Sequence, residues 1–213
     1  MITTIDEALK KRAAEELAKH DPILAAVIAR GGLCDIEPHR DYYQALVTEI
    51  ISQQLAVKAA ASIRAKFLAL FGGTFPSPET ILTKDLEELR TAGLSRAKAT
   101  YVRDLAEHVV SGRLHFDDLD DLSDADIITK LTDVKGVGTW TAHMFLMFCM
   151  GRPDVLPVGD LGIRNGIRKL YGLSSLATPD EMEEIAEKNG WHPYATIASW
   201  YVWFSLDNKP EIA

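Results

Sequence analysis

A run of eleven residues, from Trp140 to Met150, places the strongest constraint on the fold. It reads WTAHMFLMFCM and is apolar nearly all round a helix, whereas a surface helix keeps one polar face toward water. The run is too short to span a bilayer, which takes about 20 apolar residues. Such a helix must be covered by neighbours on several sides. We therefore expect residues 139–150 to form one helix at the centre of a core.

The rest of the chain shows the apolar spacing and the end signals of further helices. Thr4 and Glu7 are spaced as a capping box, which predicts a helix from there to about Lys19. One later helix has apolar residues spaced by three and four that should form a single buried face: Leu55, Ala59, Ile63, Phe67 and Leu70. No segment has the alternating pattern of a strand. We predict an all-α fold of ten or more helices, the longer ones near 4–19, 22–30, 41–53, 55–70, 95–111, 123–131, 139–150, 161–171, 179–188 and 193–206.

The formal net charge of −8 argues at first against a nucleic-acid partner, because binding phosphates takes Lys and Arg. The acidic residues are concentrated, however. Residues 117–126 carry six of them and residues 180–187 carry five, with no basic residue in either stretch. The remainder has 20 acidic against 23 basic residues and can present one positive face to a polyanion.

Two cysteines, Cys34 and Cys149, are too few for a disulfide framework or for a four-cysteine iron–sulfur cluster, so we expect neither. The histidines lack paired ligand spacing, which argues against a transition metal. The first residues do not have the basic and apolar pattern of a signal peptide, and no run is long enough for a membrane span. We expect a cytoplasmic protein with no membrane partner.

The segment between two helical patterns at 131–139, LTDVKGVGT, is the most informative about function. Gly136 and Gly138 flank Val137 and permit a tight hairpin that Val137 would anchor in the core. The amides of Gly136, Gly138 and Thr139 could then point to a phosphate, assisted by the helix dipole. Taken alone, a glycine that ends a helix before a flexible turn explains the same pattern.

About twenty residues later, Asp160 follows the apolar and Gly/Pro-containing segment LPVG at the start of a helix. Its ordinary role would be an N-cap that accepts a backbone hydrogen bond. A carboxylate kept ionised beside a cleft could instead stabilise positive charge on a sugar ring or orient a water molecule. The two roles are compatible.

These residues resemble the helix-hairpin-helix DNA glycosylases, which combine a hairpin, a Gly/Pro-rich loop and an aspartate. The matching residues are VKGVGTWTA at 134–142 and LPVGD at 156–160. Two more segments, IISQQLAVKAA at 50–60 and WHPY at 191–194, resemble signatures of the 3-methyladenine DNA glycosylase II branch. The resemblance runs from about 41 to 206, and four segments in the right order are far more specific than one.

The resemblance implies that Asp160 is the catalytic residue. Bifunctional members have a lysine two residues after the second hairpin glycine, and here that position is Trp140. The expected reaction is therefore base excision only, with water as the nucleophile and an abasic site as the product. Trp140 and Trp191 would stack on the flipped base. Two positions depart from the family pattern, Met144 for a pocket Tyr and Ala195 for Arg, which leaves the substrate range open.

The resemblance also implies contacts with DNA. One of three neighbouring residues, Gln53, Gln54 or Leu55, would wedge into the duplex where the base leaves, with the glutamines favoured. The hairpin residues would bind the backbone: Lys135, Gly136, Val137, Gly138 and Thr139. Members often hold a monovalent cation through hairpin carbonyls, which by position would be those of Thr132, Val134 and Val137 and would bind Na⁺ or K⁺.

The sequence thus predicts a compact form without an N-terminal β domain, built of two helical domains on either side of a DNA-binding cleft. Residues 41–152 would form one domain, and residues 1–40 with 153–213 the other. We expect a monomeric, monofunctional glycosylase that removes alkylated purines of the 3-methyladenine and 7-methylguanine type from double-stranded DNA and needs no cofactor. The alternatives are a non-catalytic DNA-binding module and a glycosylase for deaminated or mismatched bases.

Overall fold

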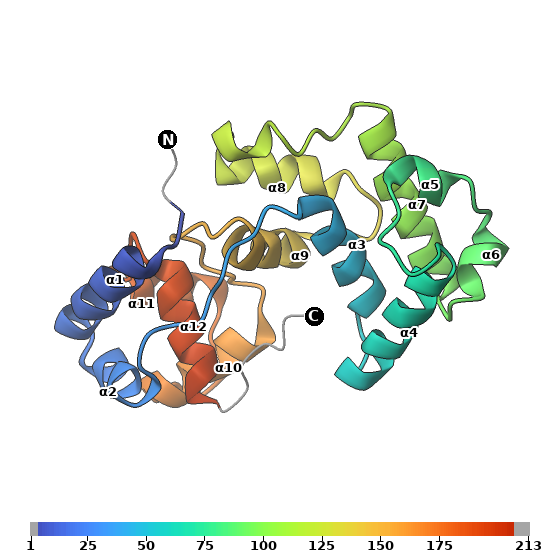
Figure 1. The fold of residues 1–213 in the computed structure, drawn as a ribbon. Coiled ribbons are helices and arrows are strands. Elements are labelled where there is room, and N and C mark those ends of the chain that lie inside the picture. Colours follow the sequence, from blue (N-terminus) through green and yellow to red (C-terminus); the bar gives the residue numbers. More distant parts are fainter. Residues whose placement is uncertain (1–3, 207–213) are drawn as a thin grey trace. The chain divides into compact units, whose positions relative to one another are not determined.

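A computed structural model describes residues 4–206, and these form helices and connecting loops with no strand (Figure 1). The all-α prediction is confirmed. The α-helices are α1 (Glu7–His20), α2 (Pro22–Gly31), α3 (Tyr42–Ser52), α4 (Val57–Ala69), α5 (Pro78–Leu82), α6 (Leu86–Arg90), α7 (Arg96–Val110), α8 (Asp124–Thr132), α9 (Thr139–Met144), α10 (Leu161–Tyr171), α11 (Pro179–Lys188) and α12 (Ala195–Ser205). None of these helices has the length and hydrophobicity that crossing a bilayer requires.

The described residues divide into two compact units, one of residues 4–40 and 143–206 and the other of residues 41–142. The predicted boundary at 152 therefore lies at 142 in the structure. Backbone hydrogen bonds explain the difference, because the amide of Ile5 donates to Gly151 O and that of His39 to Cys149 O, at 2.9 and 3.0 Å. The ring of Phe148 also packs on Trp203, with centroids 5.7 Å apart. These contacts bind residues 145–151 to the terminal segments.

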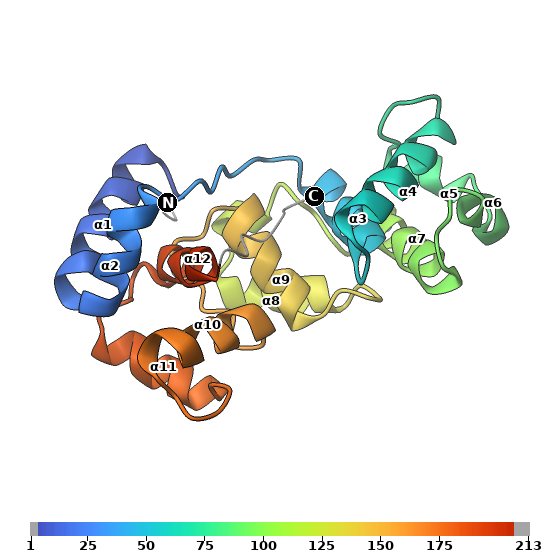
Figure 2. The same cartoon turned by 90° about the horizontal axis from the view of Figure 1, so that it is seen from below.

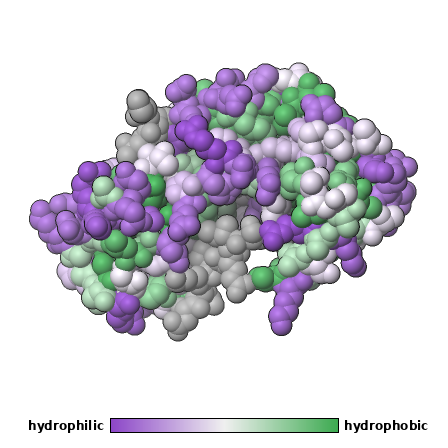
Figure 3. Space-filling model, viewed as in Figure 1, coloured by the Kyte–Doolittle hydropathy of each residue, from purple (hydrophilic) through white to green (hydrophobic). Residues whose placement is uncertain are grey.

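The unit formed by the terminal segments is built around α12, whose residues 195–203 are all buried. α12 lies between the pair α1 and α2 on one side and α10 on the other (Figure 2). On the face drawn in Figure 3, hydrophilic residues cover the outer side of α1. The expected capping box at Thr4 is wrong: α1 begins at Glu7, and its N-cap Asp6 accepts a hydrogen bond from Leu9 N at 2.7 Å.

The unit formed by residues 41–142 is built around α7, which packs against α3, α5 and α6 (Figure 1). α4 packs on α3, but its expected apolar face is only partly buried. Phe67 is fully buried, whereas Leu55 and Ala59 are exposed and Ile63 and Leu70 are half-buried. The spacing predicted the position of α4 correctly, but the core covers less of this helix than the spacing indicated.

The apolar run at 139–150 forms α9 followed by a π-helical turn, Phe145–Cys149, rather than one uninterrupted α-helix. All residues from Phe145 to Met150 are buried, which confirms the expectation for that part. At the start of α9, however, Trp140 has 42% of its surface exposed. A π-helical turn inside a helix is rare and is frequently found at functional sites.

Candidate functional site

A tight turn joins α8 to α9, as the glycine pattern predicted. Val137 is buried, and its amide donates to Val134 O at 3.1 Å, so the expected anchoring of the hairpin is confirmed. Gly136 has a φ of +82°, a conformation that L side chains rarely adopt. A Cβ on Gly136 would lie 2.5 Å from Cε2 of Tyr101 and closer still to two other ring atoms. This position requires glycine.

Gly138 differs from Gly136 in its backbone conformation and in the space around it. Its φ is not positive, and a Cβ placed there would meet no atom within 4 Å. Gly138 and Thr139 are exposed, and the carbonyl of Gly138 accepts from Ala142 N at 3.0 Å at the start of α9. The space beside Gly138 is therefore open to an approaching ligand.

Lys135 has a structural partner that the sequence did not reveal. Its amide donates to Asp104 Oδ2 at 2.9 Å, and its Nζ lies 2.8 Å from Asp104 Oδ1. This ion pair makes Lys135 a support of the hairpin, while its side chain keeps 65% of its surface exposed, so its predicted contact with a phosphate stays a prediction. No local pattern could have paired residues 31 positions apart.

The same carboxylate belongs to a polar cluster in which Asp104 and His108 are buried and Asp133 is exposed. His108 is buried, with Nδ1 3.3 Å from Asp104 Oδ2 and Nε2 3.1 Å from Asp133 Oδ2. Burial by itself raises the pKa of Asp104, but the hydrogen bonds from Lys135 and the proximity of His108 outweigh it and hold that pKa below its usual range. The hydrogen bond to Asp104 raises the pKa of Lys135.

The segment after α3 contains the three residues predicted to enter the duplex, and the structure separates them. Gln53 Nε2 donates to Gly136 O at 2.9 Å, so this amide holds the hairpin and is not directed outward. Gln54 has a φ of +56° and is exposed, and Leu55 has 36% of its surface exposed. The side chain of Gln53 is therefore engaged within the protein, and Gln54 and Leu55 are the outward candidates for the predicted wedge.

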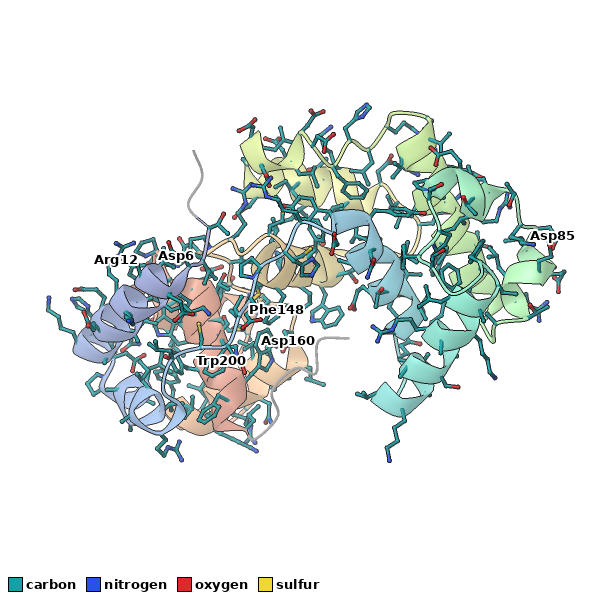
Figure 4. The ribbon with its side chains drawn as sticks, viewed as in Figure 1. Asp6, Arg12, Asp85, Phe148, Asp160 and Trp200 are labelled. Atoms are coloured by element: carbon teal, nitrogen blue, oxygen red, sulfur yellow. The ribbon has the colours of Figure 1, made fainter. Side chains whose placement is uncertain are left out.

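Asp160 is the N-cap of α10, so the cap expected from the sequence is present (Figure 4). Its Oδ1 accepts hydrogen bonds from Ile163 N at 2.7 Å and from Trp203 Nε1 at 3.0 Å, and 8% of the residue is exposed. Both donors hold the carboxylate in one orientation. A Cβ on Gly162 would lie 3.0 Å from Asp160 Oδ1 and 3.0 Å from Trp203 Nε1, so the glycine leaves room for this arrangement.

Two residues that hold Asp160 and the loop before it could not be found from the sequence, because each acts through a contact about 40 positions away. Trp203 is buried, and its indole N–H donates to the carboxylate. The buried Thr196 fixes the loop that leads to Asp160: its Oγ1 donates to Arg152 O at 2.6 Å and accepts from Val155 N at 3.0 Å.

The three residues predicted to line a base pocket have different environments. Trp140 is exposed and Met144 is half-buried. Trp191 is completely buried, and its Nε1 donates to the buried Asp21 at 2.8 Å. A ring without exposed surface cannot stack on a base, so Trp191 is a core residue and its predicted role is wrong.

An all-helical chain with a glycine hairpin between two helices and a capped aspartate after a Gly/Pro-containing loop has the features of a helix-hairpin-helix protein. The chain belongs to the HhH-GPD superfamily of base excision DNA repair proteins, whose family model matches residues 47–191. Sequence comparison finds 37% identity over 166 residues with DNA-3-methyladenine glycosylase 1 of Schizosaccharomyces pombe, covering 77% of this chain and 72% of that protein.

Two solved structures agree with this assignment. The crystal structure of DNA-3-methyladenine glycosidase from Bacillus halodurans has a TM-score of 0.82 and 36% identity, and the match covers 92% of each chain. The Schizosaccharomyces pombe 3-methyladenine DNA glycosylase in complex with abasic DNA has a TM-score of 0.79 and 33% identity, covering 92% of this chain and 97% of that one.

Proposed function

We propose that this protein is a monofunctional DNA glycosylase that removes alkylated purines, such as 3-methyladenine and 7-methylguanine, from double-stranded DNA and leaves an abasic site for base excision repair. The names of its relatives support this substrate class. In the proposal the protein acts as a monomer on a base flipped out of the duplex. A base with a methylated ring nitrogen is cationic, so it departs as a neutral molecule when the glycosidic bond breaks.

The held carboxylate of Asp160 is the observation that carries the proposal. When the bond from C1′ to the base nitrogen breaks, its electron pair leaves with the base and positive charge develops on the sugar. A carboxylate fixed in advance stabilises that charge without reorganising during the reaction. Water then adds to C1′ and loses a proton. The hydrogen bonds from Ile163 N and Trp203 Nε1 supply the preorganisation.

The residue at position 140 determines whether the enzyme only releases the base or also cleaves the DNA strand. A lysine amine at this position would attack the sugar and open a route to strand cleavage, and an indole has no such nucleophile. Its exposed ring can instead stack on a cationic base, which contributes about 0.5–2 kcal/mol depending on desolvation. The enzyme therefore releases the base without cleaving the strand, and Trp140, with Met144 four residues later in the chain, provides the stacking surface.

For DNA binding, the proposal uses the exposed backbone at Gly136, Gly138 and Thr139 as the phosphate contact, which is independent of sequence. Gln54 or Leu55 fills the space that the flipped base leaves. The carbonyls of Thr132, Val134 and Val137 are the proposed ligands of a Na⁺ or K⁺ ion between the hairpin and a phosphate. A protein with this chemistry needs no iron–sulfur cluster and no other cofactor.

The test is single-turnover release of the base from duplex DNA containing 7-methylguanine or 3-methyladenine, comparing wild type with Asp160→Asn. An asparagine still caps α10 but supplies no negative charge, so we expect excision to be lost while folding and DNA affinity are retained. Asp85→Asn is the matched control, because Asp85 is also an N-cap, of α6, and accepts from Glu88 N at 2.8 Å (Figure 4). We expect this control to excise like wild type.

Strand breaks in the wild-type reaction should appear only after alkali. Excision by Asp160→Asn at the wild-type rate would refute the catalytic assignment. Tight binding to an abasic-site analogue without release of either base would instead favour another damaged base or a DNA-binding module without catalysis.

A further inference from the structure

Lys98 reaches from α7 to the end of another helix. It is the third residue of α7, and its ammonium donates to Ile51 O at 2.8 Å and to Gln53 O at 2.6 Å. Ile51 lies in the last turn of α3, and Gln53 is the residue that follows the helix. The carbonyls at the end of a helix have no partner within it and carry partial negative charge. One ammonium therefore satisfies both the end of α3 and the beginning of the loop.

The stability of α7 does not explain this residue. A cation in the first turn of a helix opposes the helix dipole and is unfavourable there. Lys98 is also half-buried, and burial lowers its pKa because water no longer fully solvates the charge. Both terms are unfavourable locally. What Lys98 provides is its pair of contacts with the end of α3 and with the loop.

A hydrogen bond to the carbonyl of Gln53 constrains the loop directly before Gln54. This carbonyl shares a peptide plane with the amide of Gln54, so anchoring its oxygen fixes the plane from which Gln54 departs. Gln54 is the one non-glycine residue between 4 and 206 with a positive φ, a conformation that side chains other than glycine adopt only when the surroundings impose it. The side chain of Gln53 is fixed as well, by its hydrogen bond to Gly136 O in the hairpin.

We propose that Lys98 is a positioning residue for base extrusion, whose two hydrogen bonds to Ile51 O and Gln53 O hold residues 53–55 in the conformation that presents Gln54 and Leu55 to the duplex. The inference rests on the proposed glycosylase function. It assigns Lys98 no contact with the reacting atoms. Through Gln53, the same lysine also keeps this loop in register with the hairpin.

Direct binding of a phosphate by Lys98 is the competing explanation, and salt dependence separates the two. Loss of one phosphate contact lowers the slope of log K against log salt by about 1. A positioning residue has no counterion to release from DNA. For Lys98→Met we therefore expect the slope for undamaged duplex to equal that of wild type.

The main experiment compares Lys98→Met with wild type in single-turnover excision of 7-methylguanine at saturating enzyme. Each protein is tested on two duplexes. In one the lesion is paired with cytosine, and in the other it lies opposite an abasic analogue, so no base pair has to be broken before extrusion. Misplacement of a group by about 1 Å can cost about 100-fold in rate. We expect a loss of at least about tenfold on the paired lesion, and a loss several times smaller on the unpaired lesion, because unpairing costs least there.

Two further variants make the comparison specific. Lys98→Arg keeps the charge and the donors, so it should recover most of the rate on the paired lesion. Lys84→Met is the matched control, since the ammonium of Lys84 also has a partner, Glu88 Oε1 at 2.9 Å, but lies on the segment before α6. We expect it to excise both lesions like wild type. Should Lys98→Met fail to fold, Lys98→Gln is measured in the same way.

Equal losses on the paired and unpaired lesions, or a changed salt slope, would overturn the inference while leaving the glycosylase function intact. Wild-type rates of Lys98→Met on both duplexes would also overturn the inference. No excision by the wild-type protein would instead reject the proposed function, because that result does not depend on Lys98.

Discussion

Substituting the two hairpin glycines by alanine should produce two different phenotypes. Gly136→Ala puts a side chain on a backbone with a φ of +82°, which costs about 1–2 kcal/mol for an L-residue. It also drives a Cβ into the ring of Tyr101, and overpacking of this kind costs about 1–3 kcal/mol. The sum predicts a loss of about 2–5 kcal/mol in the free energy of unfolding.

Gly138→Ala has neither a positive φ nor a ring in the way of its Cβ. Its Cβ enters open space, and replacing a glycine N-cap by alanine should cost below about 1 kcal/mol. The same methyl group, however, stands where the hairpin is proposed to receive a phosphate. We expect nearly wild-type stability and weaker binding to all duplex sequences alike.

The assay is urea denaturation followed by circular dichroism, combined with titration of labelled undamaged duplex at low salt. Tyr101→Ala in the Gly136→Ala background, compared with Tyr101→Ala alone, is an internal check, since removing the whole ring should recover the overpacking part of the loss and leave the part due to φ. Wild-type stability of Gly136→Ala would refute the reasoning about the turn. Unchanged DNA affinity of Gly138→Ala at low salt would refute the assignment of the hairpin.

Three shorter predictions concern other parts of the molecule. Gly162→Ala should reduce single-turnover excision about tenfold or more with little change in DNA affinity, because its Cβ would lie 3.0 Å from Asp160 Oδ1 and displace a preorganised carboxylate; an unchanged rate would show that the carboxylate tolerates the shift. The lowered pKa of Asp104 means that its ionised form stabilises the fold above its ordinary pKa of about 4 and that this contribution disappears as the pH falls through the lowered value. The stability difference between wild type and Asp104→Asn, measured by urea denaturation, should therefore shrink below about pH 4, and a difference constant with pH would contradict the assigned shift. Trp191→Phe leaves the buried Asp21 without one donor and should cost about 1–3 kcal/mol of stability while excision continues, whereas a selective loss of excision would return Trp191 to the base pocket.

Local features of the sequence determined a large part of this protein. Helix ends are set by hydrogen bonds between residues two to four positions apart, so Asp160 could be identified as an N-cap directly. The hairpin was equally accessible, since glycine adopts the positive φ that a tight turn needs, and Val137 between the two glycines is buried as expected. Four motifs in order then led from the residues to the family, which the comparisons confirm.

Tertiary structure decided what these local features could not. Trp140 and Trp191 were both predicted to stack on the base, yet one is exposed and the other is buried against Asp21, because burial depends on which distant helices cover a side chain. Likewise, the sequence alone does not show what the ammonium groups of Lys98 and Lys135 bind. In the fold one ammonium binds the end of α3 and the other binds Asp104. Backbone preferences and caps act over a few residues and can be read along the chain, whereas the partner of a long charged side chain is chosen only when the helices pack.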